Sequence, residues 1–144
     1  MREAGSSQHR RRAVNANNRA WELIESPSLT AAEIPLLICA ATAAQWHWRR
    51  AEPDPHSVRH LRAMHLLVFA LARAGRGSDA AALAGGLAAE QSRATTGLTP
   101  FDRAMTLACQ ACAANAAPGS ALRTALETLD ADERRVITAL FAPR

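Results

Sequence analysis

The segment MHLLVFALARAGRGSDAAALAGGLAAEQS, residues 64–92, contains the pattern that decides the fold. Leu67 and Leu71 are four positions apart, so they lie on the same face of a helix. Gly75 follows, and glycine accommodates the left-handed conformation that commonly ends a helix. Small and apolar residues then recur at helical spacing, at Ala80, Ala84 and Leu87. The segment therefore predicts two antiparallel helices joined by a tight turn.

Helix start signals continue along the rest of the chain. Asp54-Pro55 and Thr99-Pro100 each place a capping residue before a proline suited to the first helical turn. Thr30 and Asp130 each precede a glutamate by three residues, which is the spacing of a capping box. We predict six to seven helices, with starts near Ser7, Thr30, Asp54, Ser78, Thr99, Ser120 and Asp130. The short joints between them favour antiparallel hairpins.

The composition favours a single helical domain. The chain has 144 residues, of which 49% are hydrophobic and 21% charged, and this is enough to bury a core. Much of the apolar fraction is alanine, the strongest helix former, whereas aromatic residues are only 4%. We therefore expect one all-α domain over residues 1–144, with residues 1–12 as a partly flexible basic segment.

Charge and cysteine content restrict the partners and the compartment. All 17 basic residues are arginine, a bias typical of GC-rich coding sequences, and the net charge is +4. Arg10, Arg11 and Arg12 form a basic run without aromatic stacking residues beside it in sequence, so nucleic-acid binding is the weakest expectation. Three cysteines, the lack of a signal-peptide pattern and the lack of a long apolar run predict a reduced, cytoplasmic protein without a membrane span.

The helix–glycine–helix pattern of residues 64–92 resembles a tetratricopeptide repeat, which places small residues where its two helices cross. A second, looser unit runs from Ala108 through Gly119 to Thr128. Its turn falls 44 residues after Gly75, whereas the usual period is ~34 residues. We therefore predict a tetratricopeptide-like, right-handed array with an irregular period.

Longer segments carry a more specific resemblance. Residues 17–25 (NNRAWELIE), residues 38–48 (ICAATAAQWHW) and the later Phe101-Asp102-x-Ala104 are similar to motifs of one family. That family consists of small bacterial, actinobacterial-type proteins of tetratricopeptide-repeat-like helices. The resemblance implies that polar residues matter on the second and third helices. His47, Arg62 and Asp102 keep the polar identity of the family pattern.

Other positions depart from that pattern. Cys39 and Thr42 stand where the family pattern has histidines, and Met64-His65 stands where it has Glu-Trp. This chain has therefore either lost the family's polar cluster or rebuilt it with other side chains.

One candidate site combines the second and third helices. Cys39 and His47 are about 80° apart around the helix axis, so both can border one groove, and the facing helix would present His65. A thiolate and two imidazoles can bind Zn²⁺ or Cu, which makes these three residues candidate metal ligands. Alternatively, His47 and His65 are catalytic acid–base groups. In a third interpretation, His47 is a hydrogen-bonded histidine at a helix packing seam.

Further residues would complete such a pocket. The ligand-binding candidates are Cys39, Trp46, Trp48, Arg62 and Asp102. One of the two tryptophans would form an apolar wall, and Arg62 would supply positive charge. In the alternative interpretation, the carboxylate of Asp102 stabilises the first turn of its own helix and has no role in binding.

Two other patterns favour structural interpretations. Cys109 and Cys112 form a Cys-x-x-Cys in the middle of a helix, where cysteines usually pack as small apolar residues. His56 and His60 are four residues apart and could share a helix face, but Arg59 beside them would repel a cation. We expect a solvated helix face there.

The functional expectation is a tetratricopeptide-like module that binds a protein or peptide partner or associates with itself. No catalytic motif such as Gly-x-Ser-x-Gly or a P-loop occurs in the sequence. The alternative is a small helical enzyme, or a ligand- or metal-binding protein, with a polar pocket around His47 and His65, serving specialised-metabolite biosynthesis. We expect no cofactor under the first hypothesis and a transition metal as an option under the second.

Overall fold

The computed structural model describes residues 2–94 and 96–142, and this part of the chain forms eight α-helices and no strand. The helices are α1 (Arg2–Glu25), α2 (Glu33–Ala51), α3 (Val58–Arg73), α4 (Gly77–Ala84), α5 (Leu87–Arg93), α6 (Pro100–Ala113), α7 (Ser120–Glu127) and α8 (Ala131–Ala139). The predicted all-α class is confirmed. None of the described helices combines the length and apolar character that crossing a membrane requires.

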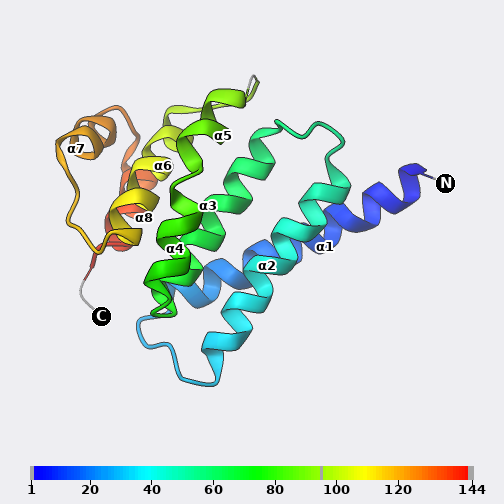
Figure 1. Ribbon diagram of the computed structural model, residues 1–144, viewed down its shortest axis with the longest axis horizontal. Coiled ribbons are helices and arrows are strands. Elements are labelled where there is room, and N and C mark those ends of the chain that lie inside the picture. The colour runs from blue at the N-terminus through cyan, green and yellow to red at the C-terminus, as the bar shows by residue number, and fades with distance from the viewer. Residues whose placement is uncertain (1, 95, 143–144) are drawn as a thin grey trace.

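Helix α3 lies at the centre of the arrangement. It contacts α1, α2, α4, α5 and α6, while α7 and α8 pack against α6 at the far end of the molecule from the start of α1 (Figure 1). Helices α1 and α2 form a long antiparallel pair (Figure 1). The central position of α3 agrees with its sequence, since Leu61, Leu66, Val68 and Phe69 are buried on several sides of the helix.

Alanines allow the helices to approach closely. The side chains with no exposed surface include Ala20, Ala41, Ala44, Ala70, Ala104 and Ala108, contributed by α1, α2, α3 and α6. Because a methyl group adds little width, helix axes can pack toward the short end of the usual ~8–10 Å range. Larger side chains such as Ile24, Leu37 and Leu87 fill the spaces between these crossings.

The turn after α3 has the predicted geometry. Gly75 has a φ of +76°, and the amide of Arg76 donates to the carbonyl of Leu71 at 2.9 Å. This is the hydrogen bond of a Schellman ending. The adjacent Gly85 and Gly86 interrupt the following helix, so α4 and α5 are separate. This break gives eight helices in the described residues where the sequence predicted six to seven.

The prediction for the start of the third helix was wrong by one turn. Asp54 accepts a hydrogen bond from the amide of His56 within a turn, and the helix begins only at Val58. Ser57 is the capping residue, and its hydroxyl accepts from the amide of Arg59. Both Asp54 and Ser57 suit a cap, and local sequence alone does not choose between them.

The start of the first helix also differs from the prediction. Residues 2–12, expected as a partly flexible segment, belong to α1 in the structure. The hydroxyl of Ser6 donates to the carbonyl of Ala51 at 3.0 Å, and Arg10 forms an ion pair with Glu52. These contacts join the first turns of α1 to the end of α2.

Candidate functional site

His47 lies where α2 packs against α1. Its Nδ1 is 2.9 Å from the Nδ1 of His9, so at least one of the two rings must be neutral and accept the hydrogen bond. The ring of Trp46 stands edge-on to His47, with 4.8 Å between centroids. Burial, followed by the nearby charges of His9, Arg12 and Arg50, lowers the pKa of His47. A neutral His47 is therefore part of the α1–α2 contact.

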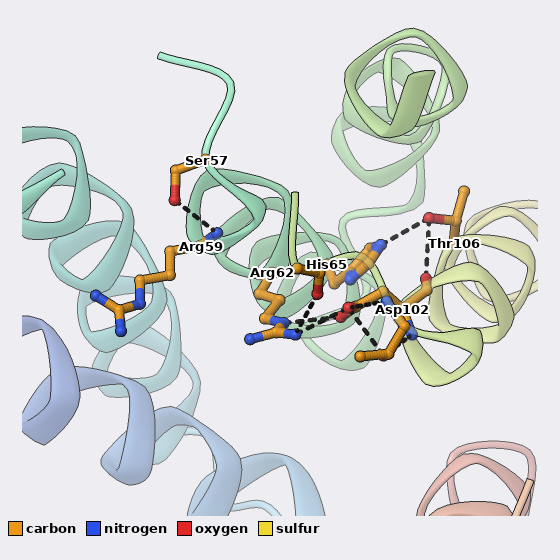
Figure 2. A network of polar contacts seen from close by, with 8 residues as sticks. Ser57, Arg59, Arg62, His65, Asp102 and Thr106 are labelled. Carbon is orange, nitrogen blue, oxygen red and sulfur yellow. Dashed lines mark hydrogen bonds and ion pairs between the residues drawn. The ribbon is translucent and has the colours of Figure 1, made fainter. Parts of the chain in front are cut away.

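His65 lies inside the core between α3 and α6, with 2% of its surface exposed. Its Nε2 is 2.8 Å from the hydroxyl of Thr106, and that hydroxyl donates to the carbonyl of Asp102 (Figure 2). The imidazole therefore donates its Nε2–H to Thr106. Burial lowers the pKa of His65 to about 4. His65 is neutral and hydrogen-bonded within the core, out of reach of solvent.

The structure does not bring the expected catalytic and metal-binding residues together. His47 faces α1 while His65 faces α6, and Cys39 is exposed on α2. In residues 2–94 and 96–142 no group of three or more His, Cys, Asp or Glu side chains is arranged to hold a metal ion. The predicted pocket of Cys39, His47 and His65 is therefore not formed, because helical spacing does not specify which neighbour each helix face meets.

Arg62 and Asp102 do meet. The Arg62 Nε donates to Asp102 Oδ1 at 2.8 Å, and its Nη2 donates to Oδ2 at 2.9 Å (Figure 2). Asp102 is 2% exposed, while the Arg62 side chain is 48% exposed. This two-pronged ion pair links α3 to the first turn of α6 and has the planar geometry that favours strong binding.

The sequence did not identify Thr99 as a partner of this ion pair. The Thr99 hydroxyl accepts from the amide of Asp102, and Asp102 Oδ2 accepts from the amide of Thr99, which completes a capping box. Burial pushes the pKa of Asp102 up, but the hydrogen bonds from Arg62 and Thr99 outweigh it and hold the pKa below its usual value. The cluster of Arg62, Thr99 and Asp102 is a well-satisfied link between helices.

The two tryptophans of α2 have different surroundings. Trp46 is 47% exposed, and the guanidinium of Arg50 lies 3.3 Å from its ring centroid. Trp48 is partly buried, with the guanidinium of Arg59 at 5.1 Å. Neither ring forms a wall of a pocket shared with His65, so the two side chains contribute cation–π contacts instead.

The cysteine pair of α6 fits the structural interpretation. Cys109 is fully buried, and its Sγ lies 3.6 Å from the carbonyl oxygen of His65. Burial raises the pKa of the Cys109 thiol well above its usual value, which makes it a poor nucleophile. The histidine pair proposed for a helix face is not formed, since His56 precedes α3 and only His60 lies on it.

A hollow of about 330 Å³ does lie between α2 and α3, although other side chains line it. Its polar lining includes Gln45, Arg49, His60 and Glu90. The Nε2 of His60 is buried there without a hydrogen-bond partner. This hollow lies between the two helices that the sequence indicated, but neither His47 nor His65 lines it.

An apolar groove of about 640 Å³ separates the end of α1 from α8. Its lining includes Trp21, Pro27, Val136 and Leu140. Val136 is 37% exposed and stands beside the other apolar side chains of the groove. We refer to this feature as the α1–α8 groove. Nothing in the sequence pattern marked it, because its two sides are more than 100 residues apart.

Comparisons with protein-family models, with curated proteins and with solved structures find no match to this chain. Its function is therefore inferred from its own residues.

Proposed function

We propose that this protein is a non-catalytic, tetratricopeptide-like helical module that binds a short segment of a protein partner in the α1–α8 groove. The observation that carries the proposal is the groove itself, with Trp21 on one side and the exposed Val136 on the other. Apolar hollows of this size, within the ~300–1,000 Å³ typical of binding sites, accept several anchoring side chains.

The rim of the groove defines the chemistry of the partner. Glu25 and Asp132 lie on its two sides, and Asp132 is paired with Arg135. The rim therefore carries a net negative charge. An amphipathic segment with apolar side chains for the groove and a basic residue beside them is complementary to this surface.

The experiment is a selection of displayed random peptides on the purified full chain, followed by titration of the enriched peptide. We expect enriched peptides that share apolar anchors flanked by Arg or Lys. The variant Val136→Asp should weaken the selected peptide about 10-fold or more, because a charge in the groove wall opposes burial of apolar anchors. Val14→Asp, which places the same charge at an exposed valine of α1 outside the groove, is the matched control.

Two results would overturn this function. One is a selection without a shared motif, or an affinity that Val136→Asp leaves unchanged. The other is a homodimer in light-scattering measurements that Val136→Asp dissociates, because a second copy of the chain would then be the occupant.

A second candidate function is binding of a small zwitterion in the hollow between α2 and α3. Arg49 lines it with positive charge and Glu52 and Glu90 with negative charge, and the buried Nε2 of His60 lacks a partner. A panel of free amino acids in thermal-shift measurements tests it. We expect at least one of them to raise the melting temperature of the wild type but not of Arg49→Gln, and equal shifts in both would contradict the idea.

A further inference from the structure

Arg73 is a partly buried cation that has no ion-pair partner in the described part of the chain. It lies at the end of α3, and its Nη2 donates to the carbonyl of Ser26 at 3.2 Å. Its Nε is buried and makes no hydrogen bond. The Nε is closed to solvent, so an acceptor from outside would meet the other N–H donors of the guanidinium.

The guanidinium borders a cavity of about 630 Å³, which we call the Arg73 cavity. The ends of α3, α6 and α8 surround it, together with Ile24 of α1 and the loop that follows α6. Its walls include Phe69, Pro118, Leu140 and Phe141. The cavity therefore combines one positive charge with walls of mixed polar and apolar character.

No acidic side chain lines this cavity among residues 2–94 and 96–142. The carbonyl ends of the surrounding helices favour a cation, which helps to explain how Arg73 is accommodated. They leave its Nε without an acceptor, however. Residues 2–94 and 96–142 therefore supply no acceptor with negative charge around the cavity.

We propose that the Arg73 cavity binds a small carboxylic acid with an apolar body, with its carboxylate on Arg73 and its body against Phe69 and Phe141. Guanidinium and carboxylate match in geometry and charge, and the apolar walls supply the rest of the binding free energy. The amide of Asn115 also lines the cavity and can donate a hydrogen bond to the same head group. The cavity shares Leu140 with the α1–α8 groove, but Arg73 does not line that groove, so this proposal does not rest on the peptide function.

The three cysteines provide a readout without a label. Cys112 lines the cavity and is partly buried, Cys39 is exposed on α2, and Cys109 is fully buried. Decanoate and 4-phenylbutanoate are the probes, with decanol and decylamine as head-group controls. We expect each acid to slow alkylation of Cys112, measured by peptide mass spectrometry, while alkylation of Cys39 in the same molecules stays unchanged.

Variants test the role of the guanidinium. Arg73→Met keeps an unbranched apolar side chain and removes the charge, and it should weaken decanoate binding about 10-fold or more in calorimetry. Arg93→Met makes the same change at an exposed arginine of α5 and should have no effect. Ala72→Phe fills the cavity while it keeps Arg73, so it should abolish binding of both acids. It serves as the second test if Arg73→Met does not fold.

The results that would contradict acid binding differ from those that would contradict peptide binding in the α1–α8 groove. The proposal fails if decanol binds as tightly as decanoate, if Arg73→Met binds decanoate like the wild type, or if neither acid protects Cys112 at millimolar concentration. Val136→Asp, which disables the groove, should still bind decanoate. Loss of peptide binding with retention of acid binding would therefore separate the two proposals.

Discussion

Asp102 joins two helices through one carboxylate. It caps α6 together with Thr99 and accepts both prongs of the Arg62 guanidinium, while almost none of it is exposed. A buried carboxylate is stable only when its oxygens are satisfied, and here both oxygens are. The residue that resembled a family's polar position is, in this structure, the point that fixes α3 against α6.

Replacing Asp102 should destabilise the fold. Asp102→Asn removes the negative charge from a buried site and should lower the free energy of unfolding by about 1–3 kcal/mol in urea titrations at neutral pH. Asp79→Asn is the control, since it breaks an exposed ion pair with Arg76 and should cost less than about 0.5 kcal/mol. Equal losses for the two variants would show that the Arg62–Asp102 pair has no special role.

His65 should make stability depend on pH. Its folded-state pKa of about 4 is below the ~6.5 of an unfolded histidine, so the unfolded chain binds the proton first as the pH falls. The contribution of His65 is therefore complete above about pH 6.5 and is lost progressively toward pH 4. Between about pH 7.5 and about pH 4.5 the free energy of unfolding should drop by about 2–3 kcal/mol through this group.

The measurement for His65 is urea unfolding at both pH values. The glutamine of His65→Gln cannot be protonated. The free energy of unfolding of this variant should therefore change by about 2–3 kcal/mol less between the two pH values than that of the wild type. His56→Gln changes an exposed histidine before α3 and should keep the full dependence. An unchanged pH dependence in His65→Gln would mean that this imidazole is not the group that titrates.

At the scale of elements, some glycines occupy a backbone conformation that favours glycine, and others occupy an ordinary helical conformation. Gly75 has a φ of +76° and ends α3, whereas Gly85 has a φ of −58° in the right-handed helical region. The Gly85–Gly86 break therefore reflects weak helix propensity and not a backbone conformation reserved for glycine.

Alanine substitutions should separate these two cases. Gly85→Ala should raise the free energy of unfolding by about 0.4–1 kcal/mol, because a Cβ there would meet its nearest atom at an ordinary 3.5 Å. Gly75→Ala should lower it by about 1 kcal/mol, although its Cβ would enter open space, because the backbone conformation itself is unfavourable. Thermal unfolding measures both, and the same sign for the two variants would contradict this explanation.

At the scale of the whole molecule, packing is uneven along the chain. Helix α3 contacts five other helices, whereas α7 and α8 pack chiefly against α6 and each bury one side chain fully, Leu122 and Ile137. Both the α1–α8 groove and the Arg73 cavity lie where this C-terminal part meets the rest. Weakly packed elements beside binding sites are a common arrangement, because such elements can adjust to a ligand.

Hydrogen exchange measured by mass spectrometry should show this gradient. We expect amides of α3 to exchange more slowly than amides of α7 and α8, since local opening costs less where fewer apolar side chains are buried. Decanoate, if bound in the Arg73 cavity, should slow exchange in α8. Uniform protection of α3, α7 and α8 would show instead that the molecule opens only as one unit.

Much of the fold follows from local sequence. The Gly75 turn and the caps at Thr99 and Asp130 were predictable because each depends on residues within one turn of a helix. The start of α3 was not predictable, because Asp54 and Ser57 are both suitable caps. That His47 and His65 contact different helices was not predictable for a larger reason: the neighbour that each side chain meets depends on which helices pack on each side.

By itself, the sequence determined that this chain is helical, where most of its helices end, and that small alanine faces would let them cross closely. Tertiary structure alone decided which polar groups meet. It directed His47 to α1 and His65 into the core, paired Arg62 with Asp102, and left Arg73 beside a cavity that no acidic side chain of the described residues lines. The physical reason is the distance along the chain over which each interaction acts. Capping and periodicity depend on residues a few positions apart. The polar contacts join residues about 40 positions apart, and they form only when the helices pack.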